Sequence, residues 1–250
     1  MSPGDRAALV LAGLALLTMP VFAAVRRARS RDPDVARRPR TALLGTWVRD
    51  WLVWAVGPLE RGLLAARVSP LACNLAGVVL GALAGIAYAC GALGPAGWLV
   101  LLGGLTDVLD GRIARAQGLV SEAGAFLDSG LDRFAEVFAL AGLATFFASQ
   151  PLRVLAVALA LGGSLLVSYA RARGEGLGVS YRGGLMARAE RLVLVGCASL
   201  LDGAAVEALD LGPGTLVAGA MAVVAVGSLA TAIHRTVAIA RVLAERAGGR

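Results

Sequence analysis

Long runs of apolar residues follow one another along almost the whole chain, and they constrain the fold more than any other feature. Several runs reach the roughly 20 residues that an α-helix needs to cross a bilayer. Only 16% of the residues are charged and 58% are hydrophobic, whereas a soluble domain averages roughly 25% charged residues. We therefore predict an all-α membrane protein. The expected membrane helices are Ala7–Val25, Leu71–Cys90, Ala96–Ile113, Glu122–Ala148, Leu152–Ala170, Arg191–Leu201 and Gly214–His234.

The first apolar run stands apart from the other six. It is followed by an arginine-rich stretch and then by a segment in which three tryptophans alternate with charged residues, which is typical of a helix lying at the membrane surface. We expect a six-transmembrane-helix core with an additional N-terminal transmembrane helix and an interfacial amphipathic helix. The predicted division is 1–25 N-terminal anchor helix, 26–40 arginine-rich cytoplasmic linker, 41–68 interfacial amphipathic helix, 69–240 six-helix domain and 241–250 cytoplasmic tail.

A cleaved signal peptide ending at Val21-Phe22-Ala23 is the alternative for residues 1–25, because small residues precede a possible cleavage site there. The arginines that come next, beginning with Arg26 and Arg27, resist translocation and favour a retained anchor.

The positive charge of the chain, +7 at neutral pH, is concentrated in alternate loops. Arginines gather in 26–40, in Arg171–Arg191 and after Arg235, whereas the expected loop Asp202–Asp210 on the other side is acidic. Arginine-rich loops stay in the cytoplasm. We predict a multi-pass protein of the cell inner (cytoplasmic) membrane with its active site facing the cytoplasm. No nucleic-acid recognition motif accompanies the charge, so we expect no nucleic-acid partner.

The residue inventory limits the chemistry. The chain has one histidine, His234, and no lysine. The single histidine disfavours a Ser-His-Asp triad and a histidine-rich metal site. The absence of lysine excludes a Schiff-base mechanism. Carboxylates and arginines remain.

Four aspartates form the most informative pattern. On a helix, Asp107 and Asp110 share an arc of about 100° with Gly111 and Ala114. On the next helix Gly124, Asp128 and Asp132 are spaced by four and share one face. The short turn between the helices would make them antiparallel neighbours, so that the two acidic pairs face each other.

Such a cluster requires water and cations. A charged residue facing lipid costs about 2.5–3.5 kcal/mol on insertion scales. Carboxylates without histidine or thiolate ligands select hard ions such as magnesium, manganese or calcium. Two such ions can hold a diphosphate and stabilise displacement at phosphorus.

Aspartates in membrane helices are also compatible with roles that involve no catalysis. They could form a proton relay or a salt bridge to Arg112, Arg115 or Arg133, and an ion transporter would also place carboxylates in membrane helices. A lipid-binding scaffold without activity is a third class.

The aspartate segment resembles the signature of the CDP-alcohol phosphotransferase (CDP-alcohol phosphatidyltransferase) family. It matches Asp-x2-Asp-Gly-x2-Ala-Arg-x8-Gly-x3-Asp-x3-Asp at every fixed position. The resemblance implies a metal-dependent enzyme that moves a phosphatidyl group from CDP-diacylglycerol to an alcohol, as a homodimer among membrane lipids. It implies Mg²⁺ or Mn²⁺ as cofactor, as two ions, at Asp107, Asp110, Asp128 and Asp132. Asp132 would also be the general base, and the CDP-binding residues would be Asp107, Gly111, Ala114, Arg115 and Gly124.

A second, looser resemblance concerns the acceptor alcohol. The segments around Arg171 and Arg191 look like those of bacterial phosphatidylinositol phosphate synthases. That resemblance implies that Arg171, Arg191 and Arg235 hold the phosphate of a phosphorylated acceptor, inositol phosphate, with glycerol 3-phosphate as the alternative. One departure is Ala189, where proline is common, and another is Pro70-Leu71, where Pro-Asn is common.

Overall fold

The computed structural model describes residues 1–26, 45–181 and 183–248. Most of the predicted linker 26–40 lies outside the described residues, as does the end of the chain. The described elements are helices: α1 (Pro3–Arg26), α3 (Thr46–Ala65), α4 (Pro70–Ala89), α5 (Leu93–Gln117), α6 (Glu122–Phe146), α7 (Pro151–Gly176), α8 (Arg188–Leu209) and α9 (Thr215–Gly248).

Five helices in the described part of the chain are long and apolar enough to cross a membrane, namely α1, α4, α7, α8 and α9. Helices α5 and α6 are as long, with 25 residues each, but they carry the aspartates that lower their hydropathy. The prediction of an all-α membrane protein is confirmed.

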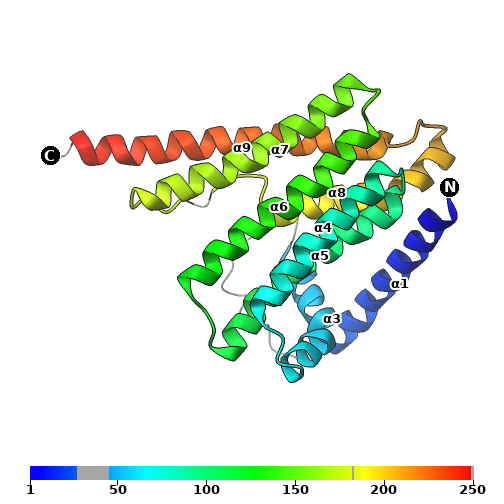
Figure 1. The fold of residues 1–250 in the computed structure, drawn as a ribbon, viewed down its shortest axis with the longest axis horizontal. Helices are drawn as coiled ribbons and strands as arrows, with labels where there is room; N and C mark the ends of the chain where they lie inside the picture. Colours follow the sequence, from blue (N-terminus) through cyan, green and yellow to red (C-terminus); the bar gives the residue numbers. More distant parts are fainter. Residues whose placement is uncertain (27–44, 182, 249–250) are drawn as a thin grey trace.

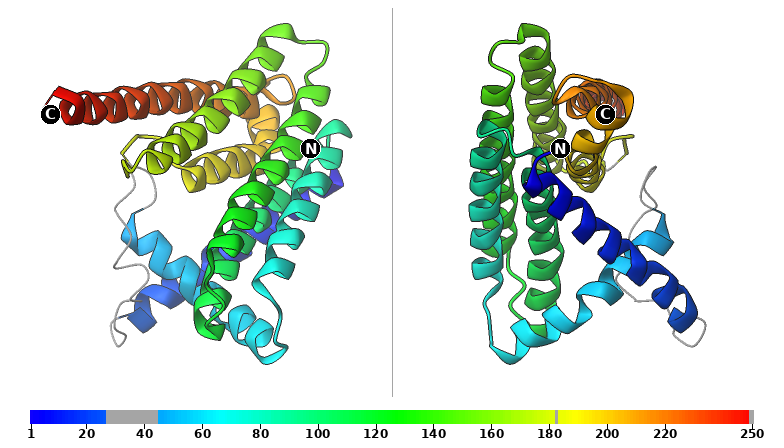
Figure 2. Two further views of the ribbon diagram at one scale, coloured as in Figure 1. Left: turned by 60° about the vertical axis from the view of Figure 1, so that its left-hand side comes forward. Right: turned by 90° about the vertical axis from the view of Figure 1, so that its right-hand side faces the viewer.

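The core consists of α4, α5 and α6 on one side and α7, α8 and α9 on the other (Figure 1). In one group α4 packs along both α5 and α6, and in the other α7 packs along α9. Contacts between α5 and α8 join the groups, whose axes diverge toward the end where α9 projects (Figures 1 and 2).

Helix α4 packs against both α5 and α6, whereas the sequence predicted that α5 and α6 pack directly against each other. The two aspartate helices are antiparallel as predicted, but they touch only sparsely because α4 packs on both. A Cβ atom on Gly81 would lie 2.6 Å from the Ala135 carbonyl oxygen, and Gly85 meets Gly142 backbone to backbone. Glycine seams of this kind let membrane helices approach closely. The expectation of direct neighbours was therefore wrong in detail, since α4 determines how far apart α5 and α6 lie.

Helices α1 and α3 lie against the first group, oblique to its axes (Figure 2). The indole of Trp51 on α3 donates to Thr18 Oγ1 at 2.9 Å, and the ring of Phe22 contacts those of Trp47, edge-on, and Trp54, tilted. The predicted helix within 41–68 is present, but its tryptophans contact α1 rather than pointing freely outward. Its place at a membrane surface stays a prediction.

The C-terminal helices extend further than expected. The stretch Asp202–Asp210, predicted to be a loop, lies almost entirely within α8. Asp202 is buried and accepts hydrogen bonds from the amides of Gly214 and Leu216, so it caps the start of α9. Residues 241–248, predicted as a tail, continue α9 because alanine, arginine, leucine and glutamate favour helix there.

Candidate metal centre and adjoining cavities

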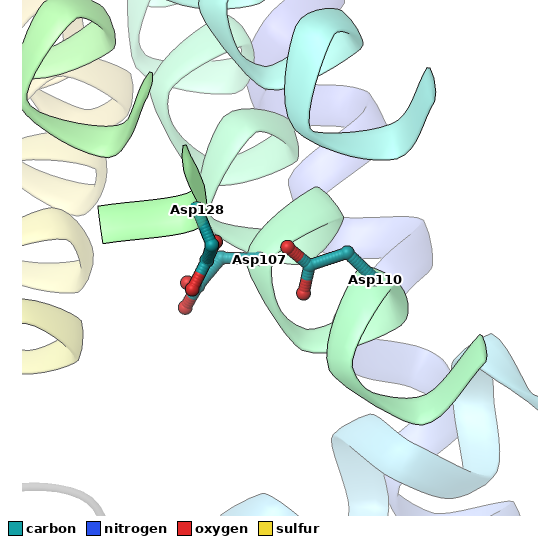
Figure 3. A group of neighbouring side chains, drawn as sticks. All are labelled: Asp107, Asp110 and Asp128. Carbon is teal, nitrogen blue, oxygen red and sulfur yellow. The ribbon is translucent and has the colours of Figure 1, made fainter. Parts of the chain in front are cut away.

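Three of the four predicted aspartates come together. One carboxylate oxygen each from Asp107, Asp110 and Asp128 lies within 4.8 Å of the other two. Figure 3 shows the Asp110 side chain turned toward the carboxylates of Asp107 and Asp128. This spacing suits oxygen atoms that share one cation.

The local sequence explains how two helices bring these groups together. Gly118 ends α5 with a left-handed backbone, φ 68°, and Ser121 begins α6 by accepting a hydrogen bond from the Gly124 amide at 3.1 Å. The reversal is short, so residues one to three turns from it lie at the same depth. The carboxylates of Asp110 on α5 and Asp128 on α6 therefore lie close together.

The carboxylates fit a divalent ion. Asp128 Oδ1 is buried and has no hydrogen-bond partner within the part of the chain that the structure describes. A buried carboxylate oxygen without a partner is costly unless a cation binds it. Because the ligand atoms are carboxylate oxygens alone, the site suits a hard ion such as Mg²⁺ or Mn²⁺.

Asp132 lies outside this group of three and is ion-paired. Its Oδ1 is 2.7 Å from Arg188 Nη2, and Arg188 Nη1 is 3.0 Å from Asp107 Oδ1. The salt-bridge partner is thus none of the three candidates that sequence proximity suggested, Arg112, Arg115 and Arg133. Arg188 comes from α8, 56 residues beyond Asp132 along the chain, so no local spacing indicates it.

A cavity between α4, α5 and α6 contains most of the predicted CDP-binding residues. Its lining includes Gly111, Ala114, Arg115 and Gly124 together with Asp110 and Asp128. Pro70, Leu71 and Asn74 of α4 also line it, although the sequence left a nucleotide contact from this helix doubtful. Asp107 is the one predicted CDP-binding residue that does not line this cavity; it lies in the next one.

The second cavity lies where the two groups of helices meet. Its polar lining consists of Asn74, Thr106, Asp107, Asp132, Glu136, Arg188 and Arg191, and most of the rest is apolar. Asn74 borders both cavities. Anionic and cationic side chains therefore face each other directly beside the aspartate cluster.

Glu136 pairs with one arginine of this second cavity, Arg191, and with Arg133, which lies outside the lining. Its carboxylate lies 3.4 Å from both Arg191 Nε and Arg133 Nη1 and accepts a hydrogen bond from Ser164 Oγ at 2.6 Å. Glu136 was not among the residues that the sequence motifs indicated. Its position, one turn beyond Asp132 on the same helix face, was the available signal.

The three arginines predicted to bind the acceptor phosphate have different surroundings. Arg191 is buried and lines the second cavity, whereas Arg171 and Arg235 are absent from that lining. Arg235 is also buried and donates to the carbonyl oxygens of Gly183 at 2.8 Å and Val167 at 3.2 Å. Arg171 is exposed and pairs with Glu175 at 3.0 Å. The structure places Arg191, but not the other two, beside the aspartates.

Comparison with known proteins gives consistent matches. A family model described as CDP-alcohol phosphatidyltransferase matches residues 67–226. Phosphatidylinositol phosphate synthase of Streptomyces avermitilis is 34% identical over 229 residues, which cover 88% of this chain and 90% of that protein. Archaetidylinositol phosphate synthase of Methanothermobacter thermautotrophicus is 37% identical over 127 residues, 51% of this chain and 64% of that protein.

Solved structures agree with these matches. The crystal structure of Mycobacterium tuberculosis phosphatidylinositol phosphate synthase with CDP-DAG bound has a TM-score of 0.64 and 28% identity, covering 73% of this chain and 92% of that one. The same enzyme in complex with manganese and citrate also has a TM-score of 0.64 and 28% identity, covering 73% of this chain and 87% of that one.

Proposed function

Since the chain belongs to the CDP-alcohol phosphatidyltransferase family, we propose that it is a phosphatidylinositol phosphate synthase, which joins CDP-diacylglycerol and inositol phosphate and releases CMP. The observation that carries this proposal is the convergence of Asp107, Asp110 and Asp128 between two cavities. One cavity holds the small residues of the family signature, and the other holds buried arginine. Family membership also makes the ion-transporter and scaffold interpretations unnecessary.

We propose that the ion site holds Mg²⁺ or Mn²⁺, as two ions, with Asp107, Asp110, Asp128 and Asp132 as ligands. The crystal structure of the mycobacterial relative with manganese supports a divalent ion. When bound, the ions would supply positive charge that stabilises the diphosphate in the transition state.

The CDP group would bind in the cavity between α4, α5 and α6. Gly111, Ala114 and Gly124 leave the helix backbones accessible there, so a flat nucleotide can approach them. Arg115 offers a guanidinium at the rim of the same cavity, suited to a phosphate oxygen.

Asp132 would act as general base from the second cavity. Its carboxylate accepts the proton of the acceptor hydroxyl while that oxygen attacks the phosphorus bonded to diacylglycerol. The bond from this phosphorus to the bridging oxygen of the diphosphate breaks, and CMP leaves with that oxygen. The Asp132 carboxylate lines the second cavity, where an acceptor would lie.

A phosphorylated acceptor agrees with the charge of the second cavity. Arg191 is 3% exposed there, and arginine binds phosphate through paired N–H donors. We include Arg171 and Arg235 in the acceptor site on the family resemblance alone, since neither lines this cavity.

We propose further that the chain lies in the cell inner membrane as a homodimer with the site toward the cytoplasm. Arg115, Arg171, Arg173 and Arg188 all lie at or near the helix ends on the side of the α5–α6 turn or the α7–α8 connection. An excess of arginine on one side of a membrane protein marks the cytoplasmic face.

The acceptor is tested by supplying purified protein with labelled CDP-diacylglycerol and Mg²⁺. Inositol phosphate, glycerol 3-phosphate, free inositol and serine are added separately, and the lipid product is identified. Of these four acceptors, we expect only inositol phosphate to give a lipid product. Faster turnover with glycerol 3-phosphate would replace the proposed acceptor, and turnover with free inositol would remove the role of Arg191 as a phosphate ligand.

A further inference from the structure

Arg188 connects the two aspartate helices from a third helix. It is the first residue of α8, and its guanidinium spans Asp107 on α5 and Asp132 on α6 at 3.0 and 2.7 Å. Its side chain is 18% exposed. A single cation thus pairs with two carboxylates that the proposed function assigns to divalent ions.

Two features of its surroundings disfavour a cation at Arg188. The first turn of a helix carries partial positive charge, which disfavours arginine there. Arg191 adds a second guanidinium to the same cavity one turn away. The two aspartates are therefore the interactions that hold Arg188 in this place.

Arg188 also retains unused hydrogen-bonding capacity. Its Nε is buried and has no hydrogen-bond partner among the described residues. Since Arg188 and Arg191 line one cavity, a guanidinium released from the aspartates would remain beside Arg191, where an anion of the acceptor would need two donors.

The charges indicate when such a release occurs. When all four aspartates are ionised they carry a charge of about −4, and two divalent ions at these ligands would cancel it. Arg188 would then be a surplus cation next to cations, and repulsion would favour its moving away from Asp107 and Asp132.

We propose that Arg188 exchanges partners: it pairs with Asp107 and Asp132 until divalent ions bind, and then turns to the phosphate of the acceptor. The inference rests on the metal ligands of the proposed function. It links the two sites, because binding of the ions makes a phosphate-binding guanidinium available, and reciprocity requires the acceptor to strengthen ion binding in turn.

The first test measures Mn²⁺ binding to the purified full chain by electron paramagnetic resonance, without substrates. Arg188→Gln removes the competing cation, so we expect Mn²⁺ to bind about tenfold more tightly than to wild type. Arg188→Lys keeps the charge and should stay within about threefold of wild type. Arg153→Gln on α7, whose guanidinium contacts Pro213 and Thr215 instead, is the control with the same loss of charge.

The second test repeats the Mn²⁺ titration with inositol phosphate present. Wild type should bind Mn²⁺ at least about fivefold more tightly with the acceptor, and Arg188→Gln should lose this gain. Unchanged or weaker Mn²⁺ binding in Arg188→Gln, or an equal gain in both proteins, would overturn the exchange. If wild type binds no Mn²⁺ at all, the proposed metal site itself is wrong, which is a separate result.

Discussion

The Glu60 carboxylate on α3 lies 2.8 Å from Arg112 Nε on α5, and both side chains are 15% exposed. Arg112 follows Asp110 and Gly111 in the family signature, whereas Glu60 precedes the residues 67–226 that the family model matches. A helix outside the matched region is therefore tied to the segment that carries the metal ligands.

We expect Glu60→Gln to lower stability by about 1–3 kcal/mol, because the largely buried ion pair between Glu60 and Arg112 is lost. Thermal unfolding in detergent measures the change. The exchanged double variant, Glu60→Arg with Arg112→Glu, should recover part of the loss, while exposed Glu245→Gln serves as control. No difference between Glu60→Gln and this control would mean that the pair contributes nothing.

Replacing the proposed base removes the proton acceptor. Asp132→Asn should reduce turnover about 10³-fold, within the range for loss of a general base. CMP release from CDP-diacylglycerol measures it. Asp210→Asn is a matched control, since Asp210 ends α8 with a left-handed backbone that asparagine also adopts. Full activity in Asp132→Asn would refute the assignment.

The crowded carboxylates should cost stability when no cation is bound. Asp128→Asn relieves their repulsion and the burial of a charged oxygen without a partner, so we expect a higher melting temperature than wild type in EDTA. With millimolar Mn²⁺ the order should reverse, because only wild type gains stability from the ion. A lower melting temperature in EDTA would contradict the metal-site interpretation of these aspartates.

Chelation should abolish activity in the wild type. The carboxylates of Asp107, Asp110 and Asp128 lie within 4.8 Å of one another and need cations to bind a diphosphate. EDTA should therefore stop CMP release, and excess Mg²⁺ or Mn²⁺ should restore it. Activity that persists through exhaustive chelation would exclude a divalent ion.

The close packing of the α4 glycines against α6 predicts that a larger side chain there destabilises the protein. Gly85→Ala puts a Cβ against the backbone of Phe138 and should destabilise the protein by about 1–3 kcal/mol. Gly162→Ala on α7 is the control, because its Cβ would meet nothing within 4 Å. Equal melting temperatures of the two variants would show that α4 and α6 can separate without loss.

The sequence predicted what depends on local periodicity. Apolar runs located α4 to α7 within a few residues, and helical spacing brought Asp107 and Asp110 to one face. The turn from Gly118 to Ser121 then accounts for the meeting with Asp128.

Relationships between distant segments could not be predicted in this way. The pairing of Arg188 with Asp132 depends on how α8 packs against α5 and α6, and the capping of α9 by Asp202 depends on the path of the α8–α9 connection. Arg171 and Arg235 are arginines like Arg191, but helix packing gives them other partners.

The absence of side chains at Gly81 and Gly85 of α4 has a consequence for how the metal centre can evolve. The carboxylates stand on two helices that scarcely touch, and their separation is fixed by a third helix that contributes no ligand to the group. A methyl group added at Gly81 or Gly85 would spread the aspartates apart as surely as a change among the aspartates themselves. The distance between the aspartates of the ion site thus depends on glycines that are not ligands themselves.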